Sequence, residues 1–321
     1  MPSDQSSHPL LGSTAVRPSW TQLPSGLRDL IASHLGSAVI TADTQGGGFS
    51  PGAAARLLLA DHGRAFVKAI PTDHALAAKH RVEADTASRL PAAVPAPRLR
   101  WHGEAAGWII LIFDDIEGRH PDLSPGSLDV ETVVSTISRM AEPLTPSPVP
   151  GLPRSAVGRS SWLHGWRELA AASPPDLGPW ERHHMNALAD LEFLWTSHTE
   201  GTTLVHGDIR PDNLLITGDG TAVVVDWAQP SQGAAWVDII DLVPHLIMAG
   251  HTPADAEKTL TRSLIWGRVH RQVITSYAAA YAGYWTRMSR QPAPPGVPNL
   301  RNYQRHAANA ALAWTAYLTR W

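Results

Sequence analysis

Two short apolar segments, each bordered by oxygen-bearing side chains, lie between residues 205 and 227. Asp208 and Asn213 stand in a loop that enters the first segment, and Asp226 ends the second. A carboxylate, a carboxamide five positions later and a further carboxylate are what phosphoryl transfer needs: one oxygen orients a hydroxyl nucleophile, and two hold magnesium. The alternative is a polar hairpin in which Asp and Asn only form local turns.

The composition limits the class of protein. A chain of 321 residues is long enough for a full hydrophobic core, in one large domain or two lobes. With 43% hydrophobic and 17% charged residues the chain is expected to fold. A net charge of −3 predicts no general attraction to nucleic acid or to an anionic membrane, so partners must be inferred from local features.

The chain contains no cysteine, which excludes disulfides, thiolate metal sites and cysteine nucleophiles. The N-terminal residues are polar and lack the basic start and apolar core of a signal peptide. No stretch approaches the roughly 18 apolar residues of a membrane helix. We therefore expect a cytoplasmic protein, and the sequence leaves its oligomeric state open.

The first part of the chain predicts an antiparallel sheet with one inserted helix. Residues 1–19, rich in Ser and Pro, predict a loose arm, and the apolar spacing over 20–35 predicts an amphipathic helix. Asp73 is a suitable cap for a helix that runs to about residue 90. The predicted strands are 38–42, 54–60, 65–70, 98–102 and 108–113.

The remainder predicts mainly helices. The stretch 143–153 is rich in proline, so it cannot continue the preceding helix and forms either a linker or a loop across the helical part. A hairpin with its turn at Gly218-Asp219-Gly220 follows the Asp208 loop. The predicted helices are 128–142, 160–171, 179–199, 237–249, 253–265 with Thr252 as cap, 268–290 and 299–320.

The sequence His206-Gly207-Asp208, followed by Asn213 and by Asp226-Trp227, resembles the catalytic and metal-binding segments of the aminoglycoside phosphotransferase and choline kinase-like family. The resemblance implies a bilobal protein-kinase-like fold of the α+β class. Its small antiparallel-sheet lobe with one helix would bind the nucleotide, and its larger, mainly helical lobe would carry the catalytic loop and the acceptor site. The implied divisions are an arm at 1–19, an N-terminal lobe at 20–116 and a C-terminal lobe at 117–321.

The same resemblance implies roles for the central residues. Asp208 orients the acceptor hydroxyl, Asn213 and Asp226 hold Mg²⁺, and ATP or GTP is the co-substrate. Arg210 replaces the lysine common at its position, which keeps a positive charge beside the transferred phosphate. We interpret His206 as a residue that shapes the loop. Asp238 is also expected to have a structural role, because the resemblance implies that it bonds to the catalytic loop.

Lys68 lies on a predicted strand whose alternation places it on one face with Phe66 and Ile70. An ammonium in such an apolar setting needs a partner. Glu83 on the following helix matches the family's lysine–glutamate pair that holds nucleotide phosphates. Asp85 is the competing carboxylate, but it points about 200° away from Glu83 around the helix.

Residues 46–52 resemble the family's phosphate-covering loop, although Pro51 stands where a third glycine would fall. Gly47 and Gly48 allow backbone amides to approach phosphate oxygens, and Ser50 can donate its hydroxyl. Taken alone, a glycine-rich hairpin tip is usually only a turn.

The apolar strand 108–113 runs into an acidic bend that resembles the hinge whose backbone binds adenine. The resemblance implies contacts to the nucleotide from Asp114 and Ile116, with Phe113 or Ile112 lining the base pocket. The alternative is an ordinary strand end with solvated acids.

The acceptor is least defined by the sequence. Residues 235–321 contain nine basic and four acidic residues, which disfavours a strongly cationic acceptor such as an aminoglycoside. Their aromatic side chains indicate either core packing or an acceptor with an apolar or planar surface. These aromatics are Trp236, Trp266, Tyr277, Tyr281, Tyr284, Trp285, Trp314 and Tyr317.

The leading hypothesis is a phosphotransferase that moves the γ-phosphate of ATP or GTP to a hydroxyl of an antibiotic or metabolite. A pseudokinase-like binding module without turnover is the alternative. A strict protein kinase is disfavoured because no Ala-Pro-Glu segment follows Asp226. A histidine metal site and a serine hydrolase are disfavoured as well, since neither HExxH nor GxSxG occurs.

Overall fold

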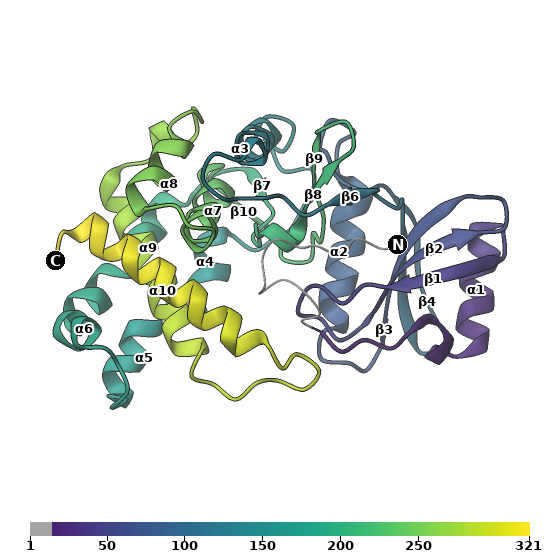
Figure 1. Cartoon of the computed structure of the whole chain (residues 1–321), viewed down its shortest axis with the longest axis horizontal. Helices are drawn as coiled ribbons and strands as arrows, with labels where there is room; N and C mark the ends of the chain where they lie inside the picture. The colour runs from purple at the N-terminus through teal and green to yellow at the C-terminus, as the bar shows by residue number, and fades with distance from the viewer. Residues whose placement is uncertain (1–14) are drawn as a thin grey trace.

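A computed structural model describes residues 15–321 (Figure 1). An antiparallel sheet forms one end of the molecule, and helices form the other. This architecture confirms the predicted α+β, bilobal fold class. Most of the predicted arm, residues 1–14, lies outside the described residues.

The N-terminal sheet has the strand order β1-β2-β3-β5-β4, and every neighbouring pair is antiparallel. Each predicted strand of this region is present. Lys68 lies opposite Leu111 in the register between β3 and β5. The strands are β1 (Val39–Thr44), β2 (Ala53–Leu59), β3 (Arg64–Pro71), β4 (Leu99–Ala105) and β5 (Trp108–Phe113).

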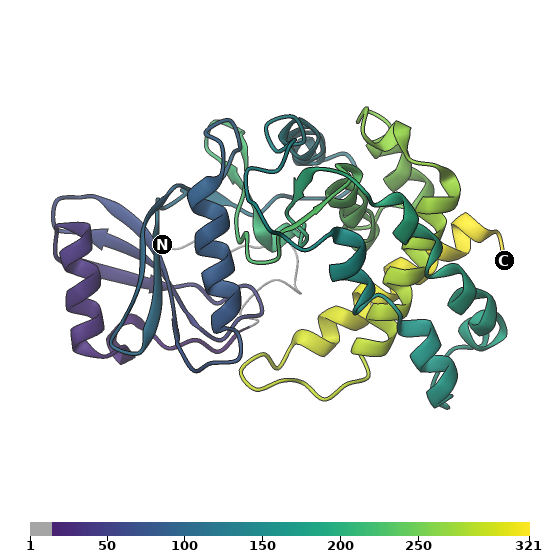
Figure 2. The ribbon, with the colours of Figure 1, turned by 180° about the vertical axis from the view of Figure 1, so that it is seen from behind.

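One helix covers each face of this sheet. Helix α1 (Ser25–Leu35) lies on the outer face, and α2 (Ala77–Arg89) lies on the face toward the helical lobe (Figure 2). Val67 packs in the apolar cluster on the α1 side, whereas Ile70 packs in the cluster on the α2 side. Alternation along β3 therefore directs Lys68, which shares the parity of Ile70, toward α2 and the second lobe.

Two predicted helix starts are wrong. The helix expected over 20–35 is split into a 3₁₀ turn, η1 (Trp20–Gln22), and α1, because Leu23 takes the extended conformation that a following proline, Pro24, favours. Asp73 does not cap α2, which begins only after Leu76. A turn takes its place, in which the amide of Leu76 donates to His74 Nδ1.

The C-terminal lobe contains the remaining long helices. Two predicted helices are shorter than expected: 179–199 breaks into a helix and the 3₁₀ segment η2 (Leu194–His198), and 253–265 ends at Leu260. Residues 160–171 divide between two helices. The helices are α3 (Leu128–Met140), α4 (Ser155–Ser160), α5 (Gly165–Ala172), α6 (Pro179–Leu191), α7 (Trp236–Met248), α8 (Pro253–Leu260), α9 (Arg271–Met288) and α10 (Leu300–Thr319).

The proline-rich stretch 143–153 is a loop packed on the C-terminal lobe. Leu144 and Val149 are buried in the main core of that lobe, and the amide of Ser147 donates to the carbonyl of Thr202. The alternative, a linker between domains, is therefore wrong.

Short strands frame the catalytic loop. β7 (Thr203–Val205) pairs with β10 (Ser231–Gly233), and β8 (Leu214–Thr217) pairs with both β6 (Gly118–Arg119) and β9 (Ala222–Val224). The hairpin β8–β9 was predicted, but β6, β7 and β10 are too short to show a periodic pattern. In the part of the chain that is described, no helix is long and apolar enough to cross a membrane.

Candidate active site

A side chain of α7 holds the backbone of the loop after β7. The carboxylate of Asp238 accepts hydrogen bonds from the amides of His206, at 2.8 Å, and Gly207, at 3.0 Å. Gly207 has a φ of 82°, and a Cβ on it would lie 2.3 Å from the carbonyl oxygen of Gln229, so only glycine fits. The predicted bond from Asp238 back to this loop is confirmed.

His206 joins the two apolar segments recognised in the sequence. Its Nδ1 accepts from the amide of Asp208 at 3.2 Å, so the ring proton sits on Nε2 and is donated to the carbonyl of Val225 at 3.0 Å. The ring also contacts Trp227 edge-on. These contacts agree with its interpretation as a residue that shapes the loop.

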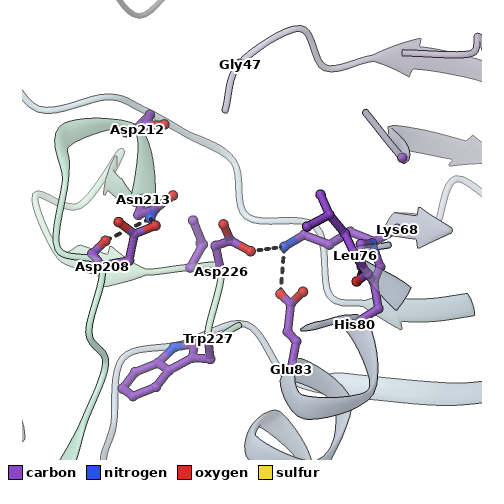
Figure 3. Close-up of polar contacts among 12 residues, drawn as sticks. Gly47, Lys68, Leu76, His80, Glu83, Asp208, Asp212, Asn213, Asp226 and Trp227 are labelled. Carbon is purple, nitrogen blue, oxygen red and sulfur yellow. Dashed lines mark hydrogen bonds and ion pairs between the residues drawn. The ribbon is translucent and has the colours of Figure 1, made fainter. Parts of the chain in front are cut away.

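Asn213 lies directly beside Asp208. Its Nδ2 donates to the backbone oxygen of Asp208 at 2.8 Å and to the carboxylate at 3.2 Å. The backbone of Asn213 in turn accepts from the amide of Val225 at 3.0 Å. The three predicted oxygen-bearing residues, Asp208, Asn213 and Asp226, are thus brought together (Figure 3).

Lys68 connects the two lobes at this point. Its Nζ lies 2.6 Å from Glu83 Oε1 and 2.5 Å from Asp226 Oδ1. The predicted pairing of Lys68 with Glu83 is confirmed, and Asp85 instead pairs with Arg89 on the surface of α2. The contact with Asp226 was not predicted.

The charges of this trio are coupled. Burial alone would lower the pKa of Lys68, but Asp226 and Glu83 outweigh it and raise that pKa. Burial raises the pKa of Glu83 to about 7 against the opposing attraction of Lys68. Burial also favours a higher pKa for Asp226. The positive charge of Lys68, and to a smaller extent that of Arg210, nevertheless holds the pKa of this carboxyl below its ordinary value. Lys68 and Asp226 therefore favour each other's charged forms, whereas burial opposes the charge on Glu83.

The oxygen donors at the site suit a hard cation that keeps most of its own ligands. The Asp226 side chain is 36% exposed, and Lys68 is bonded to its Oδ1. Asn213 directs its amide nitrogen to Asp208, which leaves its carbonyl oxygen as a second donor. Within residues 15–321 no group of three or more His, Cys, Asp or Glu side chains could hold a metal. A few protein oxygens supplemented by phosphate and water are the usual set for Mg²⁺.

Arg210 lies against the catalytic carboxylate. Its guanidinium forms a two-point pair with Asp212, at 2.9 and 3.1 Å, and Nη2 is 3.6 Å from Asp208 Oδ2. Burial would lower its pKa, but these two carboxylates raise it well above the ordinary value. The guanidinium also lies 5.0 Å from the ring centroid of Phe49 and 6.0 Å from that of Tyr303.

The glycine-rich loop is closed onto the C-terminal lobe. Figure 3 shows Gly47 above Lys68 and Asp226, and the Phe49 ring packs against Tyr303 of α10 at 5.0 Å. Ser50 Oγ is buried and has no hydrogen-bond partner among the described residues. Gly48 has a φ of 78°, which favours glycine.

The strand end expected to bind adenine is partly occupied by internal contacts. Phe113 packs on the α2 side, the face of Lys68, whereas Ile112 packs on the α1 side and cannot line a base pocket beside Lys68. The amide of Asp114 donates to the carbonyl of Arg98, and its carboxylate pairs with Arg100 at 2.5 Å. The carbonyl of Ile116 accepts from Arg56.

The aromatic residues differ in burial. Tyr277, Tyr281 and Trp285 are buried, as core residues are. Tyr284 is only half-buried and meets Trp162 edge-on at 4.6 Å. Sequence reasoning gave no role to four residues that the structure brings to this region: Arg17, Phe49, Trp162 and Tyr303. Phe49 lies within the predicted phosphate-covering loop, and the other three lie in segments without a motif that would indicate a site.

The chain is similar to known proteins over most of its length. A family model described as "Phosphotransferase enzyme family" matches residues 48–288. The chain has no match among curated proteins.

Solved structures of similar fold come from several enzymes. Choline kinase LicA from Streptococcus pneumoniae is 15% identical with a TM-score of 0.59, over 89% of this chain and 98% of that chain. Macrolide 2′-phosphotransferase MphH from Brachybacterium faecium is 16% identical with a TM-score of 0.55, over 90% and 96%. The AMP-bound complex of spectinomycin phosphotransferase APH(9)-Ia is 12% identical with a TM-score of 0.60, over 91% and 98%.

Proposed function

Because the chain belongs to the phosphotransferase enzyme family, we propose that it transfers the γ-phosphate of ATP or GTP to a hydroxyl group of a small molecule. The observation that carries this proposal is the contact of Lys68 with both Glu83 and Asp226, beside Asp208 and Asn213. In this proposal Lys68 is the cation for the phosphates, Asn213 and Asp226 are the oxygen donors for a metal, and Asp208 is the carboxylate for the nucleophile.

In the proposed reaction Asp208 accepts a hydrogen bond from the acceptor hydroxyl and aligns its oxygen with the γ-phosphorus. A bond forms between these two atoms, and the bond from phosphorus to the β–γ bridging oxygen breaks. The hydroxyl proton passes to Asp208 and the nucleoside diphosphate leaves. Asn213 and Asp226 would hold Mg²⁺, which neutralises phosphate charge when bound.

The proposed binding of the nucleotide uses groups of the N-terminal lobe. Lys68 would attract the phosphates from its position between Glu83 and Asp226, and the buried hydroxyl of Ser50 would find an acceptor in a phosphate oxygen. The AMP-bound state of the similar spectinomycin phosphotransferase supports a nucleotide in this fold. We propose a lobe boundary near residue 116.

The proposed acceptor has an apolar or planar surface. Half-buried Tyr284 and Trp162 contact each other, and Asp208 contributes to raising the pKa of Tyr284, although burial is the larger cause. Asp208 and these rings therefore share a neighbourhood. The similar structures are those of a choline kinase, a macrolide 2′-phosphotransferase and a spectinomycin phosphotransferase. An antibiotic and a metabolite are therefore both compatible with the fold.

Nucleotide binding is the first property to test. Thermal unfolding is measured with ATP and with GTP, each with and without Mg²⁺, for the wild type, for Asp226→Ala and for Asp29→Ala, an exposed control on α1. We expect a magnesium-dependent rise of a few degrees in the wild type and the control, because ligand bound to the folded state stabilises it. The rise should be absent in Asp226→Ala.

No rise with either nucleotide in the folded wild type would contradict the proposal. A rise in the wild type, but no consumption of nucleotide with any hydroxylated acceptor, would favour the alternative of a binding module without turnover.

A further inference from the structure

The segment just before η1 lies between the two lobes. The amide of Ala15 donates to the carbonyl of Gly46 in the glycine-rich loop at 3.1 Å. The next amide, that of Val16, donates to the carbonyl of Gly296 at 2.7 Å, in the loop between α9 and α10. These contacts place the side chain of the following residue, Arg17, beneath the glycine-rich loop.

Arg17 is held there by uncharged partners. Its Nη2 donates to the carbonyl of Gly47 at 2.7 Å, and its Nη1 donates to the carbonyl of Gly52 at 3.0 Å. Its Nε is buried and has no hydrogen-bond partner within the described part of the chain. None of the ion pairs found among residues 15–321 includes Arg17. The guanidinium is thus positioned by two carbonyl groups, and no carboxylate of residues 15–321 forms a direct ion pair with it.

Arg17 is buried enough for its pKa to change, and Asp226 of the proposed transfer site acts on its charge. Burial lowers the pKa of Arg17, and the carboxylate of Asp226 opposes that change. A partly buried guanidinium without a paired anion is unfavourable, because desolvation is not offset by a direct ion pair. An anion that entered between the glycine-rich loop and Asp226 would supply the missing partner.

The glycine-rich loop is shaped to admit this side chain. A Cβ on Gly48 would lie 3.2 Å from Arg17 Nη2, closer than an ordinary contact. Gly48 also has a φ of 78°. The absence of a side chain at this position therefore allows Arg17 to approach the backbone of the loop.

We infer that Arg17 binds the phosphate groups of the nucleotide, together with Lys68. The inference rests on the proposed function, and it adds a residue that precedes the family match at 48–288. A guanidinium suits phosphate because its planar set of N–H donors can bond two oxygens at once. The carbonyls of Gly47 and Gly52 each accept from one terminal nitrogen of the guanidinium, and each of these nitrogens carries a second N–H that can bond a phosphate oxygen.

The test compares ligands that differ only in phosphate number. Isothermal titration measures the affinity for adenosine, AMP, ADP and ATP, the last two with Mg²⁺, in the wild type, Arg17→Gln and Arg17→Lys. Gln can still donate to the loop but carries no charge, whereas Lys keeps the charge without the fork. Arg305→Gln, an exposed change on α10, is the matched control.

For Arg17→Gln we expect ATP affinity to fall by about tenfold or more, because one charge-assisted contact to phosphate is lost. The loss should decrease from ATP through ADP to AMP and vanish for adenosine. Arg17→Lys should recover part of the ATP affinity, and the Arg305 control should bind all four ligands as the wild type does.

Two results would overturn the inference while leaving the proposed function intact: ATP affinity unchanged in Arg17→Gln, or an equal loss for adenosine and ATP, which would indicate a purely structural role in holding the loop. Absence of ATP binding in the folded wild type would overturn the proposed function and this inference together.

Discussion

At the scale of single residues, Asp208 is held by contacts with three other residues of the catalytic loop. His206 accepts its amide hydrogen, Asn213 donates to its side chain, and Arg210 lies 3.6 Å from its Oδ2. The side chain is only 19% exposed. Its orientation is therefore set before an acceptor arrives, which reduces the entropic cost of aligning the nucleophile.

Asp208→Asn is expected to reduce turnover by roughly 10²- to 10⁴-fold, because the amide cannot take the hydroxyl proton. Nucleotide affinity should change little, since the proposed phosphate-binding residues are untouched. Steady-state kinetics with a responsive acceptor, combined with ATP titration, measure both quantities. Asp219→Asn in the exposed β8–β9 turn is the control. Full turnover in Asp208→Asn would contradict the assigned role.

At the scale of elements, α5 depends on a buried cap supplied by the end of α6. The carboxylate of Glu192 accepts from the amides of Trp166, at 2.9 Å, and Arg167, at 3.2 Å. These are first-turn amides that have no partner within the helix. Burial raises the pKa of Glu192 to about 7, and the two amides oppose that shift.

This cap predicts a dependence of stability on pH. The folded-state pKa of Glu192, about 7, lies above the ordinary value of 4.5, so between these values the folded protein binds more protons than the unfolded chain. The Glu192 carboxyl group therefore contributes fully to the free energy of unfolding below pH 4.5. This contribution falls by roughly 1 kcal/mol per pH unit as the pH rises toward 7.

Glu192→Gln should remove this part of the decline between pH 5 and 7, because the amide does not titrate. Urea unfolding at several pH values measures the difference between the wild type and the variant. Asp190→Asn, an exposed change on the same helix, should keep the wild-type slope. Parallel curves for the wild type and Glu192→Gln would show that this carboxyl is not perturbed.

At the scale of the whole molecule, the lobes are joined across the proposed transfer site. Lys68 of the sheet contacts Asp226 of the helical lobe, and Phe49 of the glycine-rich loop packs on Tyr303 of α10. The loop between α9 and α10 also approaches, since a Cβ on Gly296 would lie 3.2 Å from Pro51 Cβ. The closed position of the glycine-rich loop therefore depends on contacts with the other lobe.

Phe49→Ala is expected to release the glycine-rich loop from the C-terminal lobe. The substitution removes the ring that packs against Tyr303 and over which the guanidinium of Arg210 lies. Deuterium exchange at the amides of residues 46–52 should become at least about tenfold faster, as one lost contact of roughly 1.4 kcal/mol implies. Phe193→Ala, which removes a ring beside Arg167 elsewhere, should leave this exchange unchanged. Unchanged exchange in Phe49→Ala would mean that the loop is held by other contacts.

The sequence alone determined the parts of this protein that depend on local pattern. Alternation predicted the strands and the face of Lys68, and helical spacing selected Glu83 over Asp85 as its partner. The short run from His206 to Asn213 predicted the catalytic loop, because neighbouring residues in a tight loop cannot separate far. Helix ends at Asp73 and Pro24 were missed where a turn or a proline overrode the pattern.

Tertiary structure alone decided which distant segments meet. Lys68 and Asp226 are 158 positions apart, and Arg17 reaches the glycine-rich loop across 30 positions or more. Phe49 and Tyr303 come from opposite lobes. Periodicity fixes which face of an element a side chain occupies, but the docking of one lobe on the other fixes what that face meets, and no local pattern in the chain encodes that docking.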